Sequence, residues 1–339
     1  MSIKNIPLTL VAKDLKSNQT VRWCPGCGDY SILAQIQKTM PQLGLPKEDF
    51  VVISGIGCSS RFPYYMDTYG IHSIHGRAPT LATGLAISNP DLSVWVITGD
   101  GDALSIGGNH FIHTIRRNID INIILFNNRV YGLTKGQFSP TSRQGHRSKS
   151  SPMGSIEQPI NPIALALAAN ATFIARALDT DTKHMGETFK TAAEHKGTSL
   201  VEVYQNCVIF NPNEWGELQN RRKRDDYIIY LEDGKPMVFG KNMDKGIRVT
   251  DGYELEVVDL GDEYTEADLL VHDVKSKAIA RMISSMEWPH FPAALGVIRE
   301  VSERTYTEGL EEQITLAQEQ KGVGDLHSLY RDADLWEIE

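Results

Sequence analysis

Short apolar runs recur along the first two thirds of the chain, and most of them lack a strict alternation of apolar and polar positions. Runs of this kind are typical of strands that are covered on both faces of a sheet. They fall at 51–53, 93–98, 121–126 and 200–204. Stretches with helical spacing lie at 30–40, 80–88, 103–117, 162–170 and 182–196. This alternation predicts an α/β fold built on a doubly wound, mostly parallel sheet.

The last third of the chain has a different pattern. Apolar residues flank an Asp-Gly pair, which predicts a hairpin over 227–239. Amphipathic spacing predicts helices at 275–286 and 307–320. No chemical motif appears here. We therefore expect a ligand-binding domain over 1–212 and a smaller C-terminal extension over 213–339, which packs on the core or on a partner subunit.

Composition and charge exclude several classes of protein. The chain has 339 residues with 34 Lys and Arg against 43 Asp and Glu, a formal net charge of −9. A balance this acidic argues against a general nucleic-acid binder, because that affinity comes from clustered positive charge. No apolar run approaches the roughly 18 residues of a membrane span, and the first residues lack a signal-peptide core. We expect a cytoplasmic protein with no nucleic-acid or membrane partner.

Two polar motifs follow predicted strands at the edge where doubly wound sheets bind ligands. Residues 99–102 read Gly-Asp-Gly-Asp, and 127–128 read Asn-Asn. The glycines let the backbone approach a phosphate, and a helix that begins there offers free N–H groups to an anion. Asp100, the Asn128 amide and the Val130 carbonyl are oxygen ligands of the kind that magnesium takes together with substrate phosphates.

Each motif alone is also a common turn. Their pairing changes that balance, because the 25 residues of 102–126 leave room for one helix and one strand between them. The two motifs then stand at adjacent strand ends. This arrangement resembles the thiamine diphosphate-binding motif and favours a diphosphate and magnesium site over two unrelated turns.

Four cysteines form a second constellation, at Cys24, Cys27, Cys58 and Cys207. The first two make a Cys-x-x-Cys pair, which lets two thiolates bind one metal or cluster. Three interpretations compete: structural zinc, an iron–sulfur cluster, and four unrelated buried thiols. Both metal sites use four thiolates, but structural zinc usually takes two close pairs. Cys58 and Cys207 each follow a predicted strand, so both can converge on the ligand edge beside the first site.

Six segments together give the chain a specific resemblance. They are 23–28 (Trp-Cys-Pro-Gly-Cys-Gly), 56–61 (Ile-Gly-Cys-Ser-Ser-Arg), 75–78 (His-Gly-Arg-Ala), 99–102, 127–137 (Asn-Asn-Arg-Val-Tyr-Gly-Leu-Thr-Lys-Gly-Gln) and Cys207. With them the chain resembles the β subunit of 2-oxoacid:ferredoxin oxidoreductases, which carries thiamine diphosphate and an iron–sulfur cluster. The resemblance covers residues from about 20 to 212.

The resemblance implies a role for each matching residue. Cys24, Cys27, Cys58 and Cys207 would bind one [4Fe–4S] cluster. Asp100, Asn128 and the Val130 carbonyl would bind Mg2+. The residues expected to contact thiamine diphosphate are Ile56, Gly57, Cys58, Ser59, His75, Gly99, Gly101, Asp102, Gly132 and Leu133.

Two of the residues in these segments are candidates for catalysis. His75 stands just before a predicted helix, where it can donate to the diphosphate or stabilise charge near the thiazolium. The alternative is a satisfied polar residue at a helix start. Lys135 can reach the mouth of the site and pair with the distal carboxylate of a dicarboxylic 2-oxoacid, and a solvated loop charge is an equal alternative.

The resemblance also implies an activity, CoA-dependent oxidative decarboxylation of a 2-oxoacid, or its reductive reverse, with electrons passing through the cluster to ferredoxin. Lys135 stands between Thr134 and Gly136, where pyruvate-type relatives have Thr-Gly. This favours the 2-oxoglutarate or broad 2-oxoacid branch. We expect 2-oxoglutarate as the substrate, and a pyruvate or broad-specificity enzyme is the alternative. We expect a separate α subunit, in an α2β2 assembly, to supply the glutamate that binds the cofactor's aminopyrimidine.

Rival functions make different predictions from the same motifs. A non-redox thiamine decarboxylase needs no cluster. A pure electron-transfer subunit needs no paired Gly-Asp-Gly and Asn-Asn motifs, and a zinc-stapled binding module would contain zinc instead of iron.

Several other polar residues fit a structural role better than a chemical one. His110 and His113 lie one turn apart on a predicted helix, but no third metal ligand accompanies them. Arg143 and Arg147 lie in a long loop, where solvated charges are the rule. Trp23 next to Cys24 is expected to shield the cluster by packing.

Overall fold

The apolar strands of the chain assemble into one eight-stranded sheet. The computed structural model describes residues 10–331. The strand order is β2-β1-β3-β4-β6-β5-β11-β7, and all neighbours are parallel except β11, which runs antiparallel to β5. The strand bounds are β1 Phe50–Ser54, β2 Tyr69–His72, β3 Ser93–Gly99, β4 Ile121–Asn127, β5 Phe173–Leu178, β6 Thr198–Tyr204, β7 Ile228–Tyr230 and β11 Ala293–Glu300. The expected doubly wound, mostly parallel α/β fold is confirmed.

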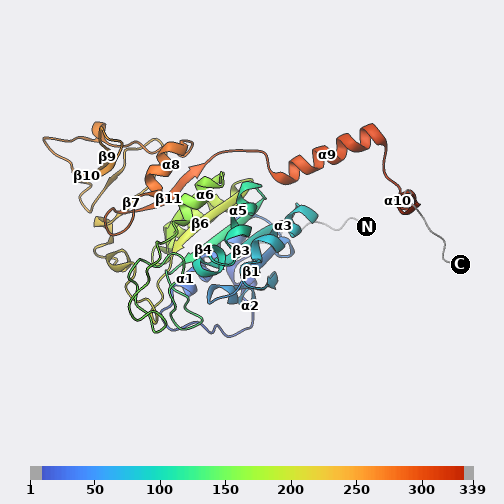
Figure 1. Cartoon of the computed structure of the whole chain (residues 1–339), viewed down its shortest axis with the longest axis horizontal. Helices are drawn as coiled ribbons and strands as arrows, with labels where there is room; N and C mark the ends of the chain where they lie inside the picture. Colours follow the sequence, from blue (N-terminus) through green and yellow to red (C-terminus); the bar gives the residue numbers. More distant parts are fainter. Residues whose placement is uncertain (1–9, 332–339) are drawn as a thin grey trace.

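Helices cover both faces of this sheet (Figure 1), and each face has its own apolar core. One face packs against α3 (Ala78–Ser88), α5 (Gly108–Arg116), α6 (Pro162–Ala168) and α8 (Lys277–Ser284). The other packs against α1 (Asp29–Thr39), α2 (Phe62–Tyr65) and α7 (Thr182–Glu194). Strand β1 shows why its run is apolar at every position. Val51 and Ile53 enter the first core, and Phe50 and Val52 enter the second.

The helix predicted over 103–117 is wrong in its extent, because the structure has two helices there. They are α4 (Asp100–Leu104) and α5, separated at Ser105–Gly107. The backbone of the neighbouring loop passes close at this break. A Cβ on Gly107 would lie 2.4 Å from the Asp102 carbonyl oxygen, and one on Gly76 would lie 2.5 Å from the Gly107 nitrogen. The chain turns where two backbones meet and no side chain fits.

The hairpin predicted over 227–239 is also wrong. Strand β7 joins the large sheet as the parallel neighbour of β11. The next strand instead pairs with β9 in a separate three-stranded antiparallel sheet of β8 (Val238–Phe239), β9 (Lys245–Val249) and β10 (Leu255–Asp259). Because Ile228 and Ile229 are both buried, the apolar side chains of β7 decide its partner, not the Asp-Gly turn that follows.

The C-terminal third therefore contributes to the main sheet. Two of its strands, β7 and β11, extend the sheet past the expected boundary at residue 212. Beyond β11, α9 (Tyr306–Lys321) leads away from the body of the molecule, followed by α10 (Leu326–Arg331) (Figure 1). A capping box at Thr305 and Glu308 begins α9. Over residues 10–331, no helix combines the length and the apolar character needed to cross a membrane.

The fully buried Phe189 of α7 allows a test of the second core. We expect Phe189→Ala to lower the free energy of unfolding by about 3–5 kcal/mol, because it leaves a cavity under the helix. Lys190→Ala, on the exposed side of the same helix, should change it by less than about 0.5 kcal/mol. Denaturant unfolding of both variants measures the difference, and equal stabilities would contradict this packing.

Candidate active site

The polar motifs meet at the carboxyl edge of the sheet around one cavity, which we call the motif cavity. It lies at the ends of β1, β3 and β4. Every residue expected to contact the cofactor or magnesium lines it: Ile56, Gly57, Cys58, Ser59, His75, Gly99, Asp100, Gly101, Asp102, Asn128, Val130, Gly132 and Leu133. Sequence reasoning did not single out four further lining residues, Asp29, Phe126, Tyr131 and Thr134. The structure thus brings the predicted set together, and the role of each residue stays a prediction.

Asp102 joins two separate loops to the end of strand β3 at this cavity. Its Oδ1 accepts hydrogen bonds from the backbone N–H of Ile56 at 3.0 Å and of Gly76 at 2.8 Å. Its Oδ2 accepts from the Thr98 hydroxyl at 2.8 Å. The side chain is buried, so these donors replace water around its charge. Both oxygens are thus engaged by the protein, and Asp102 fixes the walls of the cavity instead of offering a free oxygen.

His75 stands at the mouth of the same cavity, with 39 % of its side chain exposed. Its Nδ1 lies 2.7 Å from Asp102 Oδ1, an ion-pair contact that does not have hydrogen-bond alignment. The imidazole ring is therefore in direct contact with the buried carboxylate.

Asp100 is the first residue of α4 and is almost fully buried. Its Oδ2 accepts hydrogen bonds from the hydroxyls of Ser139 at 2.5 Å and Thr141 at 2.6 Å. Burial raises the pKa of Asp100 to about 6, although the two hydroxyl donors act in the opposite direction. A carboxylate desolvated to this degree gains most from a nearby cation.

Ser139 and Thr141 were missed by sequence reasoning. Thr141 lies in the long loop that also holds Arg143, and Ser139 lies just before that loop. Nothing in their spacing marks them as partners of Asp100. Only the fold brings this loop back across the end of β4.

The Asn-Asn turn carries the other two candidate oxygen ligands. Asn128 donates through Nδ2 to Gln205 Oε1 at 2.7 Å, and its Oδ1 accepts from the Val130 N–H at 3.1 Å. Arg129 between them has a φ of 55°, a left-handed conformation that few residues other than glycine adopt. This tight turn brings Asn128 and Val130 to the cavity.

Only glycine fits at position 101, because the ring of Tyr131 packs directly against its backbone. A Cβ there would lie 2.2 Å from the ring of Tyr131, whose hydroxyl donates to the Gly101 carbonyl at 3.0 Å. The Gly-Asp-Gly motif and the Asn-Asn segment are therefore packed directly against each other.

The four cysteines line a second cavity of about 270 Å³, which we call the cysteine cavity. A side chain on Gly132 would reach both Cys58 Sγ, at 3.5 Å, and Cys207 Sγ, at 3.6 Å. Among residues 10–331, no three His, Cys, Asp or Glu side chains are close enough to hold one metal ion.

The surroundings of the cysteine cavity disfavour the charged form of the thiols. Burial, followed by the Asp29 carboxylate, raises the pKa of the Cys27 thiol far above its ordinary value. The same two causes raise the pKa of Cys58 to about 12. Thiolates here need a positively charged metal group to offset desolvation.

Asp29 borders both cavities. Its carboxylate is buried, and Oδ2 has no hydrogen-bond partner within residues 10–331. Burial raises the pKa of Asp29 to about 7. The sequence places Asp29 directly after the Cys-x-x-Cys-Gly segment, which could have marked it as a site residue. Its effect on the neighbouring thiols, however, depends on its burial, which the sequence does not reveal.

The structure separates the two residues expected to act in catalysis. Lys135 lines the cysteine cavity, whereas His75 lines the motif cavity. Trp23 and Arg143 both make contacts within the protein. Trp23 donates to the Cys58 carbonyl at 2.6 Å and packs beside the cysteines, and Arg143 pairs with Glu214 at 2.8 Å.

Comparison with known proteins agrees with this geometry. Residues 55–203 match the thiamine pyrophosphate enzymes in their C-terminal TPP binding domain. The site is thus that of a thiamine diphosphate enzyme. The chain belongs to the β subunits of the 2-oxoacid:ferredoxin oxidoreductases, as the resemblance implied.

Two relatives and one solved structure support the assignment to this family. The chain is 49 % identical over 332 residues to the 2-oxoglutarate oxidoreductase subunit KorB of Mycobacterium tuberculosis, covering 96 % of this chain and 88 % of the relative. It is 49 % identical over 189 residues to the β subunit of 2-oxoacid:ferredoxin oxidoreductase 1 of Aeropyrum pernix, covering 56 % and 59 %. The 2-oxoglutarate:ferredoxin oxidoreductase of Magnetococcus marinus, solved with 2-oxoglutarate, coenzyme A and succinyl-CoA bound, aligns with a TM-score of 0.77 at 31 % identity over 98 % of both chains.

Gly55 tests the anchoring of the loops, since a Cβ there would lie 1.9 Å from Asp102 Oδ2. We expect Gly55→Ala to displace the carboxylate and to weaken thiamine diphosphate binding by about tenfold or more. Gly84→Ala, where a Cβ meets open space on exposed α3, is the matched control. It should bind normally and gain up to about 1 kcal/mol of stability. Cofactor titration of both proteins distinguishes them, and normal binding by Gly55→Ala would refute the anchoring role.

Proposed function

We propose that this chain is the catalytic β subunit of a 2-oxoglutarate:ferredoxin oxidoreductase. The single observation that supports it best is the contact of the two cavities. The motif cavity and the cysteine cavity share Asp29, Cys58, Asn128, Gly132 and Leu133. A thiamine site and a four-thiolate site with common walls suit an enzyme that decarboxylates a 2-oxoacid and removes electrons one at a time.

The motif cavity fits the diphosphate end of the cofactor. Its volume of about 90 Å³ is below the ~300 Å³ of a pocket for a whole small ligand. Gly99 and Gly101 keep the backbone open toward it, and Tyr131 closes over Gly101. When bound, thiamine diphosphate supplies a thiazolium that acts as electron sink for the decarboxylation.

Asp100, Asn128 and the Val130 carbonyl suit a magnesium ion that bridges to the diphosphate. All three are oxygen donors, which a hard cation prefers. Ser139 and Thr141 hold one oxygen of Asp100, so the carboxylate is already oriented before any cation arrives.

Cys24, Cys27, Cys58 and Cys207 suit one [4Fe–4S] cluster better than zinc. A structural zinc ion usually takes its four ligands as two close pairs, whereas only Cys24 and Cys27 form a close pair here and the other two thiols come from distant loops of the same cavity. Trp23 covers one side through its contacts with Cys58 and Tyr65 and limits access of water.

The substrate and partners follow from the relatives and from Lys135. Relatives named 2-oxoglutarate oxidoreductase and 2-oxoglutarate synthase both point to 2-oxoglutarate as the substrate. The Magnetococcus enzyme was solved with 2-oxoglutarate and coenzyme A bound. Lys135 supplies a cation for the distal carboxylate of such a substrate. We propose coenzyme A as acyl acceptor, ferredoxin as electron acceptor and an α2β2 assembly in which the α subunit contributes the pyrimidine-binding glutamate. A pyruvate-specific or broad 2-oxoacid enzyme is the alternative.

The cluster assignment predicts the metal content of variants. We expect Cys207→Ser to lose most iron and sulfide, because one thiolate ligand is removed from a four-thiolate site. Val208→Ala, a neighbour that lines the same cavity without a thiol, should keep them. Anaerobic metal and sulfide analysis of the complex with the α subunit gives the answer. Zinc in place of iron in the unaltered protein would refute the cluster.

The activity is tested by CoA-dependent viologen reduction, performed anaerobically with the α subunit present. We expect 2-oxoglutarate to be preferred over pyruvate. Lys135→Ala should raise the KM for 2-oxoglutarate by about tenfold or more, since a hydrogen bond to a charged group contributes about 1.5–3 kcal/mol. Lys149→Ala, an exposed loop lysine, serves as control. A preference for pyruvate, or full turnover by this chain alone, would overturn the substrate or the partner assignment.

A further inference from the structure

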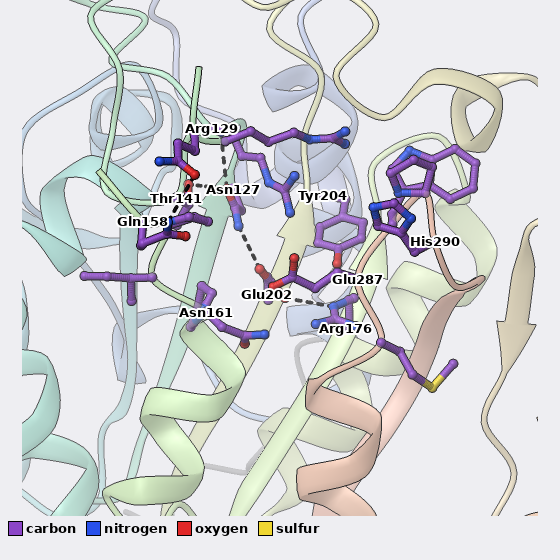
Figure 2. A pocket seen from close by; sticks show the side chains of 18 residues that line it. Asn127, Arg129, Thr141, Gln158, Asn161, Arg176, Glu202, Tyr204, Glu287 and His290 are labelled. Carbon is purple, nitrogen blue, oxygen red and sulfur yellow. Dashed lines mark hydrogen bonds and ion pairs between the residues drawn. The ribbon is translucent and has the colours of Figure 1, made fainter. Parts of the chain in front are cut away.

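Five buried polar side chains form a continuous row across the carboxyl half of the sheet, which we call the polar row. It consists of Arg176, Glu202, Asn127, Thr141 and Asp100, all at most 3 % exposed. Figure 2 shows four of its members, all but Asp100, where they line a separate cavity of about 380 Å³. The row crosses the neighbouring strands β5, β6 and β4 and ends at α4, which follows β3.

Each member of the row touches the next. Arg176 Nε donates to Glu202 Oε2 at 2.8 Å, and Asn127 Nδ2 donates to Glu202 Oε1 at 2.7 Å. Asn127 Oδ1 lies 3.0 Å from Thr141 Oγ1, which donates to Asp100 Oδ2 at 2.6 Å. The row thus joins an ion pair in the sheet to the carboxylate proposed to bind magnesium.

Glu202 determines how the Asn127 amide is oriented. An ionised carboxylate only accepts hydrogen bonds, and one oxygen of Glu202 is already used by Arg176. Asn127 must therefore present its NH2 group to the other oxygen, which turns its Oδ1 toward Thr141 and the Arg129 backbone.

The oriented oxygen of Asn127 supports both halves of the proposed metal site. It accepts the Arg129 N–H at 3.2 Å, which stabilises the left-handed residue between Asn128 and Val130. It also lies within hydrogen-bond distance of the Thr141 hydroxyl, whose single proton is shared between Asn127 Oδ1 and Asp100 Oδ2. Reversal of the amide would set its NH2 against the Arg129 N–H, leaving two buried donors facing each other.

We propose that Glu202 is a positioning residue for the magnesium–diphosphate site, held in place by Arg176. This inference rests on the proposed function, because it takes Asp100, Asn128 and Val130 as the magnesium ligands. Neither Glu202 nor Arg176 lines the motif cavity, so both act through Asn127. A buried ion pair is in itself a weak source of stability, whereas fixing the direction of an amide gives it a specific role.

Glu202→Gln changes the pattern of donors while keeping the shape of the side chain. Because Arg176 needs an acceptor, the Gln oxygen turns to it and the Gln NH2 group meets the Asn127 NH2 group. We expect the apparent Mg2+ dissociation constant in thiamine diphosphate binding to rise by about 10-fold to 100-fold, the usual effect of losing an outer-shell partner. Iron and sulfide content should stay unchanged.

The measurement is a binding titration, independent of turnover. The complex of the full chain with its α subunit is titrated with Mg2+ at fixed thiamine diphosphate, and tryptophan fluorescence or calorimetry reports binding. The double variant Glu202→Gln with Asn127→Asp restores an acceptor at 127 opposite a donor at 202, and it should recover most of the lost affinity. Ser199→Ala, which removes a buried hydroxyl at the other end of β6, should lower Tm without changing Mg2+ affinity.

The possible outcomes distinguish the positioning role of Glu202 from the proposed function of the chain. Wild-type Mg2+ affinity in Glu202→Gln, an equal loss in Ser199→Ala, or no recovery in the double variant overturns the positioning role. If the unaltered complex shows no Mg2+-dependent thiamine diphosphate binding, the proposed function itself fails, and the positioning role fails with it.

Discussion

The buried carboxylate of Asp102 is the interaction on which the site depends. A desolvated charge costs several kcal/mol unless hydrogen bonds compensate it. Asp102 obtains them from Ile56, Gly76 and Thr98, which belong to three different segments. The folded state therefore keeps these loops together or loses the compensation. The absence of a side chain at Gly55 follows from the same constraint, because the carboxylate occupies that space.

Sheet topology places the second constellation beside the first. Parallel strands share one ligand edge, so the loop after β1 and the loop after β6 meet although Cys58 and Cys207 are far apart in sequence. Cys58 belongs to the same loop as Ile56, which Asp102 anchors. In the proposed enzyme, a residue that would bind the cluster and residues that would face the cofactor therefore lie on the same loop, which would keep the path for an electron short.

The sequence predicts correctly those strands whose own residues determine them, and it fails where a partner distant in the chain decides the structure. Strands β1, β3, β4 and β6 are apolar because both faces are covered, and the motifs follow their ends. The hairpin prediction failed because the partner of β7 lies more than 60 residues later, in β11. Strand β5 escaped notice because Arg176 interrupts its apolar run, and only its pairing with Glu202 across the sheet makes that charge acceptable. Ser139, Thr141 and Asp29 likewise gain their importance from burial that no spacing reveals.

The carboxylates that line the motif cavity bear on the expectation that a second subunit supplies the pyrimidine-binding glutamate. Among the lining residues described, the carboxylates are Asp29, Asp100 and Asp102. Asp102 is held by three protein donors, and Asp100 is turned toward Ser139 and Thr141. Asp29 lies at the border with the cysteines. None of them is a glutamate placed for an aminopyrimidine, and the cavity suits only the diphosphate end. The proposed function therefore assigns the aminopyrimidine half of the cofactor site to the α subunit, as the resemblance to a β subunit implies.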